Sequence, residues 1–511
     1  MQEQDVLYEL ARCLPLTLPD SLRKYAKEIC SGPGAKGPPY KKIFAILVLI
    51  EKAASIVEFM DEGLHDGCLP LPKVPLDLVG NTSGWAFTFV RKDEGKNAIQ
   101  RLQSFQGFSR MNHKNFDACQ WALLAPIFRR PHRQDVQLEY LHSQAILPFS
   151  EEEEVAQGGY GEVSRVVIHP DNHDFNTHTT PTPSSNQFAI KRLKQFDERP
   201  FRAEFDMLSN FSEDAHSHLI SLLAAYQQHN SFHLIFPWAE ADLLRFWMEI
   251  RPKPDFNKTV RWMSAQCSGL ADGLSMIHRY GSFGLQRRDG KHMRSGIKLY
   301  GRHGDIKPAN VLWFPDLGSA GGDEDGVLKL TDFGLAELHS LDSRSAIPKS
   351  QVATSMSYRP PECDIPEQKI CRLYDIWALG CLYLEFVVWL LGGWDLLKVF
   401  AINRMGKLPN PAISLLEEDF SFFELIEGGR SARVKRSVTE FIRNKLHGNP
   451  KCSAYIHEFL DLIEQHMLVI ETRDADGRID CGQLNARLVA MHQRCKKDEI
   501  YALKPVLTKS T

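Results

Sequence analysis

Two short polar segments, "HGDIKPANVL" and "KLTDFGLAE", constrain this chain more than any other feature. In the first, Asp305 and Asn310 lie five residues apart in a turn-rich stretch before an apolar run. In the second, Asp332 directly follows the strand-like run "VLKLT". Carboxylate and side-chain amide oxygens are hard donors that suit Mg²⁺. The spacing therefore predicts a loop in which Asp305 acts as a base while Asn310 and Asp332 hold a magnesium ion.

A glycine-rich turn and a strand lysine lie upstream of these segments. The turn "GGYGEV" supplies Gly158, Gly159, Gly161 and Val163. Glycine lets backbone N–H groups approach phosphate oxygens without a Cβ in the way. Lys191 lies on the apolar strand "FAIKRL", where its ammonium requires a carboxylate, and Glu204 on the following amphipathic helix is the natural partner. Lys307, two residues after Asp305, is expected to contact the phosphoryl group that is transferred. Together with the glycine turn, Lys191 and the magnesium ligands, it completes the parts that phosphoryl transfer from ATP requires.

Taken in order, these motifs resemble a eukaryotic-type serine/threonine protein kinase over roughly residues 150–495. The segment "SYRPPE" is similar to the Ala-Pro-Glu segment of that family, and Arg478 fits the arginine that pairs with its glutamate, here Glu362. The segment "DIWALG", with Asp375 and Trp377, resembles the opening of the family's central helix. The run Ile-Lys-Pro-Ala-Asn after the aspartate is typical of the serine/threonine members.

The resemblance implies an α+β, two-lobed protein-kinase-like fold. A small antiparallel β lobe is expected over about 146–238 and a large α-helical lobe over 239–495, which together make a kinase domain of residues 146–495. We expect a mainly helical N-terminal region over 1–145 and a C-terminal tail over 496–511. The helical region resembles the one that precedes the kinase domain in atypical predicted kinases of filamentous fungi.

The resemblance also implies ATP and Mg²⁺ as cofactors and a protein substrate. Asp305, Lys307, Lys191 and Glu204 would be the catalytic residues, with Asn310 and Asp332 as metal ligands. Besides the glycine turn and Lys191, the nucleotide would contact Val163, Ala189, Phe236 as gatekeeper, and Trp238 in "FHLIFPWAEADL".

Three positions depart from the family pattern. Ala156 replaces the first glycine of the phosphate-binding turn, and Gly304 replaces the arginine before the catalytic aspartate. The segment "ATSMSY" is one residue longer than the usual spacing, so either Thr354 or Ser355 could contact the catalytic loop. The missing arginine is the one that binds a phosphate on the activation segment, so we expect activity that does not depend on phosphorylation there.

Two other functional classes compete with this interpretation. Small-molecule phosphotransferases share "HGD" and the asparagine after it, but they generally carry His at the position of Lys307 and lack the "DFG" and "PPE" segments. A catalytically weak, ATP-binding scaffold is the second alternative. It is disfavoured because the lysine, the base and both metal ligands are all present.

Other segments have clear local patterns. The apolar period of "YKKIFAILVLIEKAASIVEFM" predicts a helix over 40–60, and "NFDACQWALLAPIF" predicts another that ends near Pro126. Loops are predicted over 170–187 and 281–301, and "PDLGSAGGDEDG" is typical of a long hairpin turn. Loop 281–301 carries five Lys and Arg residues, so partner binding is predicted either there or at the N-terminal helical region.

Charge and composition bear on the protein's partners and on its cellular compartment. A net charge of −3, from 61 basic and 64 acidic residues, creates no field that favours nucleic acid or a membrane surface. The eleven cysteines are scattered without a C-x-x-C pair, which is typical of reduced thiols. The apolar run "IWALGCLYLEFVVWLLGG" contains Glu385 and predicts a buried core helix rather than a membrane span. We expect an intracellular soluble protein, cytoplasmic or nuclear, without a nucleic-acid partner.

Overall fold

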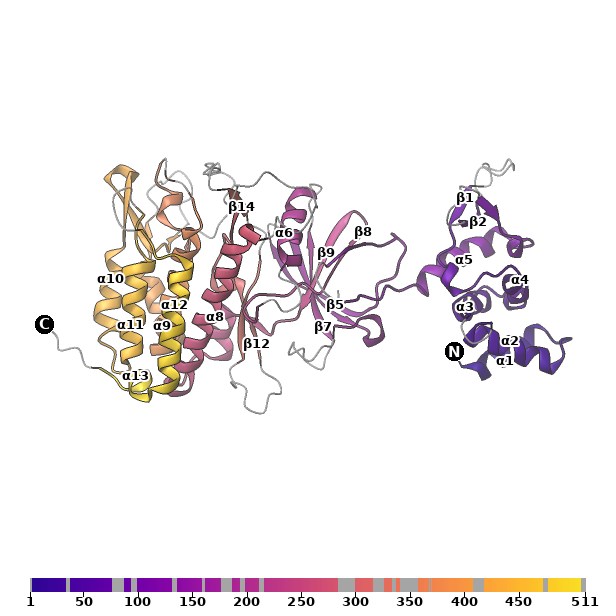
Figure 1. Ribbon diagram of the computed structural model, residues 1–511, viewed down its shortest axis with the longest axis horizontal. Helices are drawn as coiled ribbons and strands as arrows, with labels where there is room; N and C mark the ends of the chain where they lie inside the picture. Colours follow the sequence, from indigo (N-terminus) through magenta and orange to yellow (C-terminus); the bar gives the residue numbers. More distant parts are fainter. Residues whose placement is uncertain are drawn as a thin grey trace. The chain divides into compact units, whose positions relative to one another are not determined.

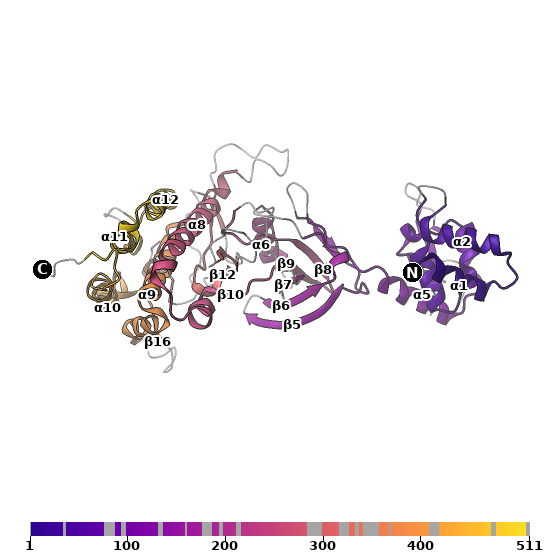
Figure 2. The ribbon, with the colours of Figure 1, turned by 90° about the horizontal axis from the view of Figure 1, so that it is seen from below.

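The chain folds into two compact units. The computed structural model describes residues 2–33, 37–75, 87–92, 99–130, 136–158, 161–175, 186–193, 198–210, 216–283, 299–315, 326–332, 337–340, 357–366, 368, 370–407, 418–471 and 477–506. The first unit comprises Met1–Phe128, Tyr140–Ser150 and His169–His173, and the second comprises the rest. Figure 1 and Figure 2 show the elements of each unit.

The first unit combines helices with a small sheet of order β1-β2-β3. Its helices are α1 (Glu3–Cys13), α2 (Pro19–Ser31), α3 (Lys41–Leu49), α4 (Ile56–Asp61) and α5 (Arg110–Ala122). Its strands are β1 (Lys73–Pro75), β2 (Phe87–Lys92) and β3 (Ile99–Arg101). Its core contains an aromatic cluster, in which the centroid of the Phe105 ring lies 5.0 Å from that of Phe59, 4.7 Å from that of Phe89 and 5.0 Å from that of Phe116.

The helix predicted over 40–60 is divided in two. Helix α3 ends at Leu49, Glu51 takes a left-handed φ of 58°, and α4 begins at Ile56. Both halves bury their apolar faces in the same core, so the apolar period continues across a turn that it cannot reveal. The second prediction is confirmed, since α5 ends at Ala122, before Pro126.

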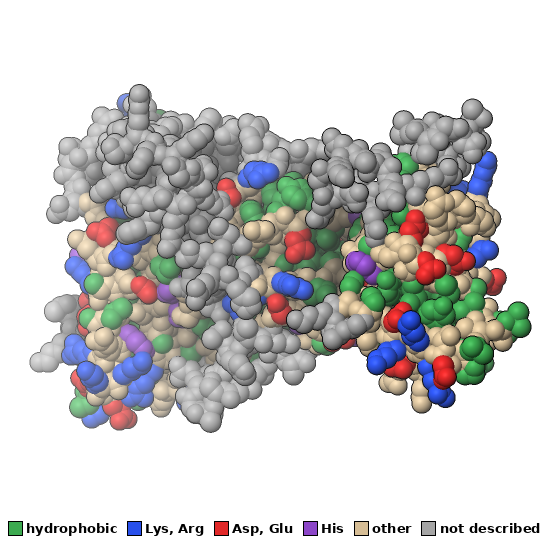
Figure 3. Space-filling model, turned by 45° about the vertical axis from the view of Figure 1, so that its right-hand side comes forward, with side chains coloured by type: hydrophobic (Ala, Val, Ile, Leu, Met, Phe, Trp, Pro, Cys, Tyr) green, Lys and Arg blue, Asp and Glu red, His purple; other side chains and the backbone are tan. Residues whose placement is uncertain are grey.

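Apolar side chains remain exposed on the first unit. Tyr8 is 71% exposed and Leu49 64%, and both line a groove of about 480 Å³ with Ala45 and Val48. Figure 3 shows hydrophobic side chains reaching the surface of this unit. Isolated apolar residues are normal on protein surfaces, so the groove alone identifies no partner.

The second unit has the two lobes that the resemblance implies, and the predicted fold class is confirmed. The small lobe is an antiparallel sheet of order β4-β8-β9-β7-β6-β5, crossed by helix α6 (Glu198–Asn210). Its strands are β4 (Leu138–Tyr140), β5 (Phe149–Gly158), β6 (Gly161–Ile168), β7 (Gln187–Leu193), β8 (Ala224–Gln228) and β9 (Ser231–Pro237). The ring of Phe201 on α6 stacks on Phe232 of β9 at 3.9 Å between centroids, which fixes the helix against the sheet.

The large lobe is mainly helical. Its helices are α7 (Leu243–Arg245), α8 (Phe256–Phe283), α9 (Leu373–Arg404), α10 (Arg436–Phe441), α11 (Ala454–Leu462), α12 (Cys481–Lys497) and α13 (Glu499–Leu503). Its short strands are β10 (Ala241–Asp242), β11 (Leu299–Arg302), β12 (Val311–Phe314), β13 (Val327–Leu330), β14 (Glu337–Ser340), β15 (Gly406–Lys407), β16 (Glu418–Asp419), β17 (Phe423–Ile426) and β18 (Ser431–Val434). Strands β10, β12 and β13 form one sheet, which carries the segments that bear Asn310 and Asp332.

Helix α9 is the central helix of this lobe. It is long and apolar enough to cross a membrane, but 94% of its most apolar 18-residue stretch is buried inside the protein. The predicted core helix is therefore present, and it carries Asp375 and Glu385 into the interior.

The predicted loops agree with the structure to different extents. The hairpin is confirmed, because β12 and β13 pair antiparallel across it. The segment over 170–187 begins with an ordered turn, and Phe175 is fully buried, contrary to the expectation of a loop without core residues. Helix α8 and β11 occupy both ends of 281–301, and residues 284–298 lie outside the described part. The expected tail contains α13, which buries Tyr501.

Candidate active site

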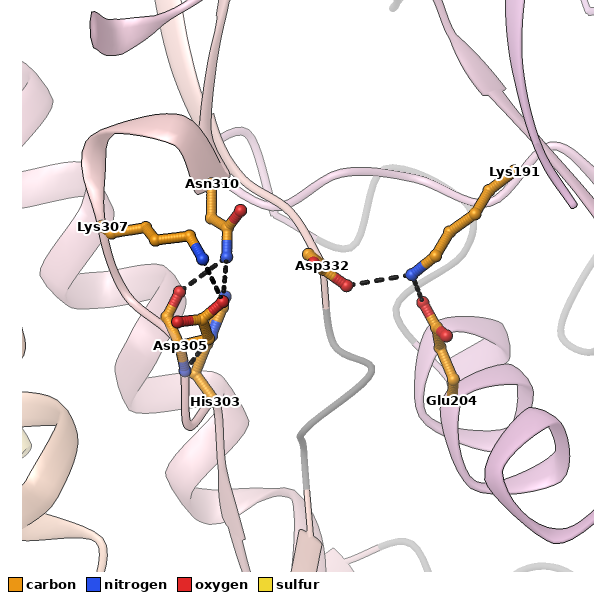
Figure 4. Close-up of polar contacts among 7 residues, drawn as sticks. All are labelled: Lys191, Glu204, His303, Asp305, Lys307, Asn310 and Asp332. Atoms are coloured by element: carbon orange, nitrogen blue, oxygen red, sulfur yellow. Dashed lines mark hydrogen bonds and ion pairs between the residues drawn. The ribbon is translucent and has the colours of Figure 1, made fainter. Parts of the chain in front are cut away.

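A lysine whose side chain is only 14% exposed lies between two carboxylates where the lobes meet. Lys191 Nζ lies 2.7 Å from Glu204 Oε1 on α6 and 2.9 Å from Asp332 Oδ1 at the end of β13 (Figure 4). Burial alone would lower the pKa of Lys191, but the two carboxylate charges outweigh it and hold that pKa above its usual value. Lys191 is therefore a fixed cation that ties the small lobe to the large one.

The second cluster is built within one short loop. Asp305 Oδ2 accepts hydrogen bonds from Lys307 Nζ at 2.7 Å and from Asn310 Nδ2 at 2.8 Å. Asn310 Nδ2 also donates to the backbone oxygen of Asp305 at 2.8 Å. The backbone oxygen of Asn310 accepts from Thr331 N at 3.0 Å, which joins this loop to the strand that carries Asp332. The sequence-predicted residues thus meet in the two groups that Figure 4 shows.

The backbone of the loop that carries Asp305 is held by an aspartate from the central helix. Asp375 is fully buried and accepts from the backbone N–H groups of His303 and Gly304, each at 2.9 Å. His278 Nε2 on α8 lies 2.8 Å from the same carboxylate. Burial opposes the charge of Asp375, but these hydrogen bonds and the nearby histidines outweigh it and lower its pKa. The carboxylate thus acts as a charged anchor for the loop.

Two residues of the site have left-handed backbone conformations. Gly304 has a φ of 86°, where a side chain would be strained, so glycine suits this position for a conformational reason. Asp332 has a φ of 66°, an uncommon value for a residue with a Cβ. Such strain persists only where the surroundings impose it. Here the ion pair with Lys191 is one such constraint on Asp332.

Four of the residues predicted to contact the nucleotide share one face of the small sheet. Val163 pairs with Lys191 across β6 and β7, and Ala189 pairs with Phe236 across β7 and β9. Directly paired residues project to the same side of a sheet, so these four side chains lie on one face. Trp238 follows β9 and lies 5.9 Å from the Arg165 guanidinium, measured to its ring centroid.

The glycine-rich turn is described only in part. Gly158 ends β5 and Gly161 begins β6, while Gly159 lies outside the described residues. A Cβ at Gly161 would lie 2.5 Å from the backbone oxygen of Arg192, so close strand approach alone requires glycine there. This requirement explains Gly161 without reference to a phosphate.

Two polar networks hold the segment that ends in "PPE". Arg478 Nη1 and Nη2 bind the two carboxylate oxygens of Glu362 at 2.5 and 2.7 Å. Glu385 accepts from Tyr358 Oη at 2.7 Å and from Arg404 Nη2 at 2.7 Å. The Glu362–Arg478 pair expected from the resemblance is therefore present. Thr354 and Ser355 lie outside the described residues.

Several residues of the site have no clear signal in the sequence. No pattern identifies His278 or His303, and Asp375 is recognisable only as part of the "DIWALG" motif. The available signal is an aspartate in the first turn of a helix whose next nine residues are uncharged and mostly apolar, because a buried carboxylate requires donors. Nothing in the sequence identifies those donors as the backbone N–H groups of a loop 71 and 72 residues away.

Comparison with known proteins agrees with this geometry. Residues 149–391 match the family model described as the protein kinase domain. A serine/threonine-protein kinase SSN3 from Yarrowia lipolytica is 24% identical over 46% of this chain and 50% of its own length. A cyclin-dependent kinase E-1 from Arabidopsis thaliana is 25% identical over 41% of this chain and 40% of its own length.

A cyclin-dependent kinase 8 from Drosophila melanogaster is 29% identical over 34% of this chain and 34% of its own length. The chain thus spans half or less of the length of these relatives. The family match does not reach the N-terminal region, so its likeness to predicted fungal kinases stays a prediction. The two-lobed fold, the paired lysine and the family match agree, and the chain therefore contains a protein kinase domain.

Proposed function

We propose that this chain is an ATP-dependent serine/threonine protein kinase that transfers the γ-phosphate of Mg-ATP to hydroxyl groups of protein substrates. The observation that carries the proposal is the position of Lys191 between Glu204 and Asp332. This arrangement fixes a cation beside a carboxylate at the junction of the lobes. Phosphoryl transfer depends mainly on such positioning and charge stabilisation.

The donor set fits a magnesium ion. Asn310 uses Nδ2 for both of its hydrogen bonds to Asp305, and its side-chain oxygen points away from Asp305 in Figure 4. Asp332 supplies a carboxylate from the adjacent strand end. Bound Mg²⁺ would neutralise the charge that develops on the phosphates. Asn310 and Asp332 are the residues that would hold it.

Asp305 is the proposed base. Its Oδ2 is bound by Lys307 and Asn310, so the carboxylate has a fixed orientation before any substrate arrives. In that orientation it would accept the proton of a serine or threonine hydroxyl. Lys307, already at 2.7 Å from Asp305, would contact the phosphoryl group as it moves toward that hydroxyl.

A protein substrate is favoured over a small molecule by the part of the lobe that follows "ATSMSY". Tyr358 is held through Glu385 to Arg404, and Glu362 is held through Arg478. These networks stabilise an ordered surface after the activation segment, on which an extended peptide could lie. A site for a small metabolite needs no such surface. The N-terminal region and loop 281–301 remain the proposed partner-binding parts.

The test is a radiometric assay of the purified full-length chain with Mg-ATP and generic protein substrates. We expect phosphate on serine and threonine of the substrates, and none when EDTA replaces Mg²⁺. Acid hydrolysis of the labelled protein would identify the phosphorylated residue type. Labelling of small metabolites without labelling of any protein would instead support the phosphotransferase alternative.

Replacing Glu204 by Gln should reduce activity without abolishing it. The change removes the carboxylate charge beside Lys191 and leaves only an amide oxygen to accept from its ammonium, so a loss of about 1.5–3 kcal/mol should lower kcat/KM for ATP roughly 10- to 100-fold. Steady-state kinetics over a range of ATP concentrations would measure it. Glu152→Gln, on the exposed part of β5, is the matched control and should behave as wild type. Equal kinetics for the two variants would contradict the role of Glu204.

Dephosphorylation should leave the initial rate unchanged. An arginine at position 304 would bind a phosphate on the activation segment, but Gly304 has no side chain, and its φ of 86° disfavours any replacement. We expect phosphatase-treated and untreated samples to have equal initial rates with Mg-ATP. A large loss that rephosphorylation restores would mean that another cation binds an activating phosphate.

A further inference from the structure

Three side chains of the types that can bind a metal ion lie close together near the C-terminal end of the large lobe. His447 follows the end of the α10 region, Cys452 lies in the turn after it, and His457 lies on α11 (Figure 1). One ring nitrogen of each histidine and the Cys452 Sγ all lie within 4.8 Å of one another. The sequence spacing is H-x₄-C-x₄-H, and none of these residues belongs to the site described above.

The two imidazole rings approach each other through their Nδ1 atoms. His447 Nδ1 and His457 Nδ1 are 2.6 Å apart, the ring centroids are 4.9 Å apart, and the two ring planes are inclined by 19°, so the rings meet edge to edge. His457 Nε2 lies 3.1 Å from the backbone oxygen of Val506, which can only accept a hydrogen bond. The proton of neutral His457 is therefore on Nε2, and its Nδ1 presents a lone pair.

The surroundings of His447 favour the same tautomer. Asp461 Oδ1 lies 3.7 Å from His447 Nε2, and its negative charge favours a proton on that nitrogen. With both Nε2 atoms protonated, two Nδ1 lone pairs face each other at 2.6 Å. That contact is repulsive unless the two nitrogens share a proton or bind a common metal ion. A carbonyl or carboxylate behind each imidazole is also the usual arrangement around metal-binding histidines.

We propose that His447, Cys452 and His457 form a zinc site that links the turn 447–453, α11 and the C-terminal segment. Imidazole and thiolate donors suit Zn²⁺, and three protein ligands leave one coordination position to water. Binding displaces the thiol proton of Cys452 to solvent. Ligand nitrogens on tetrahedral zinc lie about 3.3 Å apart, so the rings would separate by less than about 1 Å on binding.

The backbone around the cluster shows what such a site would stabilise. The backbone oxygen of Cys452 accepts from Val506 N at 3.0 Å, and Ser453 forms a bridge with Pro505. The Val506 oxygen then accepts from His457. A metal at this point would fix the segment after α13 against α11. Such a metal would stabilise the C-terminal segment, and the proposal does not depend on the proposed catalytic function.

The experiment measures metal content and spectra of the full-length chain. The protein is stripped with a chelator, loaded with Zn²⁺ and desalted, and zinc is measured by mass spectrometry. We expect about one Zn²⁺ per chain, with a melting temperature that rises by roughly 3–6 °C at saturating metal. Co²⁺ loading should give visible bands of a tetrahedral site and a near-ultraviolet thiolate-to-metal band.

Variants separate the site from general stability effects. Cys452→Ala and His457→Gln should lose the metal and the cobalt bands. Cys495→Ala is the matched control, because Cys495 is also fully buried but belongs to no metal-ligating group among the described residues, and it should retain both. The wild-type cobalt spectrum tests the proposal even if Cys452→Ala does not fold. Failure of the wild-type chain to hold zinc, or retention of zinc by both ligand variants, would overturn the site and leave a histidine pair that shares a proton.

Discussion

Replacing Asp305 by Asn should lower kcat by about 10²–10⁴-fold while ATP still binds. The carboxylate is the acceptor at the centre of its loop, since Lys307 and Asn310 both donate to it. Asparagine has nearly the same shape, so the loop should stay folded. The change removes the proton acceptor and the negative charge beside Lys307. Single-turnover kinetics with a labelled protein substrate would measure the chemical step.

The ATP-binding readout distinguishes a lost base from a damaged fold. The increase in melting temperature caused by Mg-ATP should be the same in Asp305→Asn and in wild type. Asp255→Asn is the matched control, because Asp255 accepts a hydrogen bond from Asn257 N at the start of α8 and asparagine can replace it there. That control should keep full activity. A wild-type rate in Asp305→Asn would mean that another group accepts the proton.

The parts of the site that sequence could predict are those set by local pattern. Lys191 falls on an apolar strand and Glu204 on an amphipathic helix, and a buried ammonium requires a carboxylate. Their contact at 2.7 Å follows from this requirement together with the order of the two elements. The same reasoning anticipated Asp332 at a strand end, but it did not anticipate its direct contact with Lys191 at 2.9 Å.

The unpredicted parts depend on backbone geometry and on distant segments. From sequence, Gly304 is only the position where the family pattern has arginine, whereas its φ of 86° gives a conformational reason for glycine there. Asp375 holds the loop through two N–H groups, and backbone donors have no sequence signature. The turn at Glu51 cannot be seen in the apolar pattern because the helices on both sides of it face one core. Strands β1 and β3 have only three residues each, which is too short for an alternating pattern to show.

Replacing Arg478 by Ala should lower the free energy of unfolding of the second unit by about 3–5 kcal/mol, because it leaves a buried carboxylate without its partner. The side chain of Arg478 is fully buried and that of Glu362 is 3% exposed. Arg478 also donates to the backbone oxygens of Val469 at 2.8 Å and Leu373 at 3.1 Å. Four acceptor contacts are therefore lost at once, in addition to the packing of the guanidinium 5.1 Å from the Trp377 ring centroid.

Urea unfolding followed by tryptophan fluorescence would measure this loss. The chain has nine tryptophans, and only Trp85 and Trp121 fall in the first unit, so the signal reports mainly on the second. The double variant Glu362→Gln with Arg478→Met should recover part of the stability, since no charge is then buried alone. If Arg478→Ala lowered the free energy of unfolding by less than about 1 kcal/mol, the buried pair would contribute no more than an exposed salt bridge does, which would contradict the prediction. If the double variant were less stable than Arg478→Ala, the cost would come from lost hydrogen bonds rather than from the unpaired carboxylate.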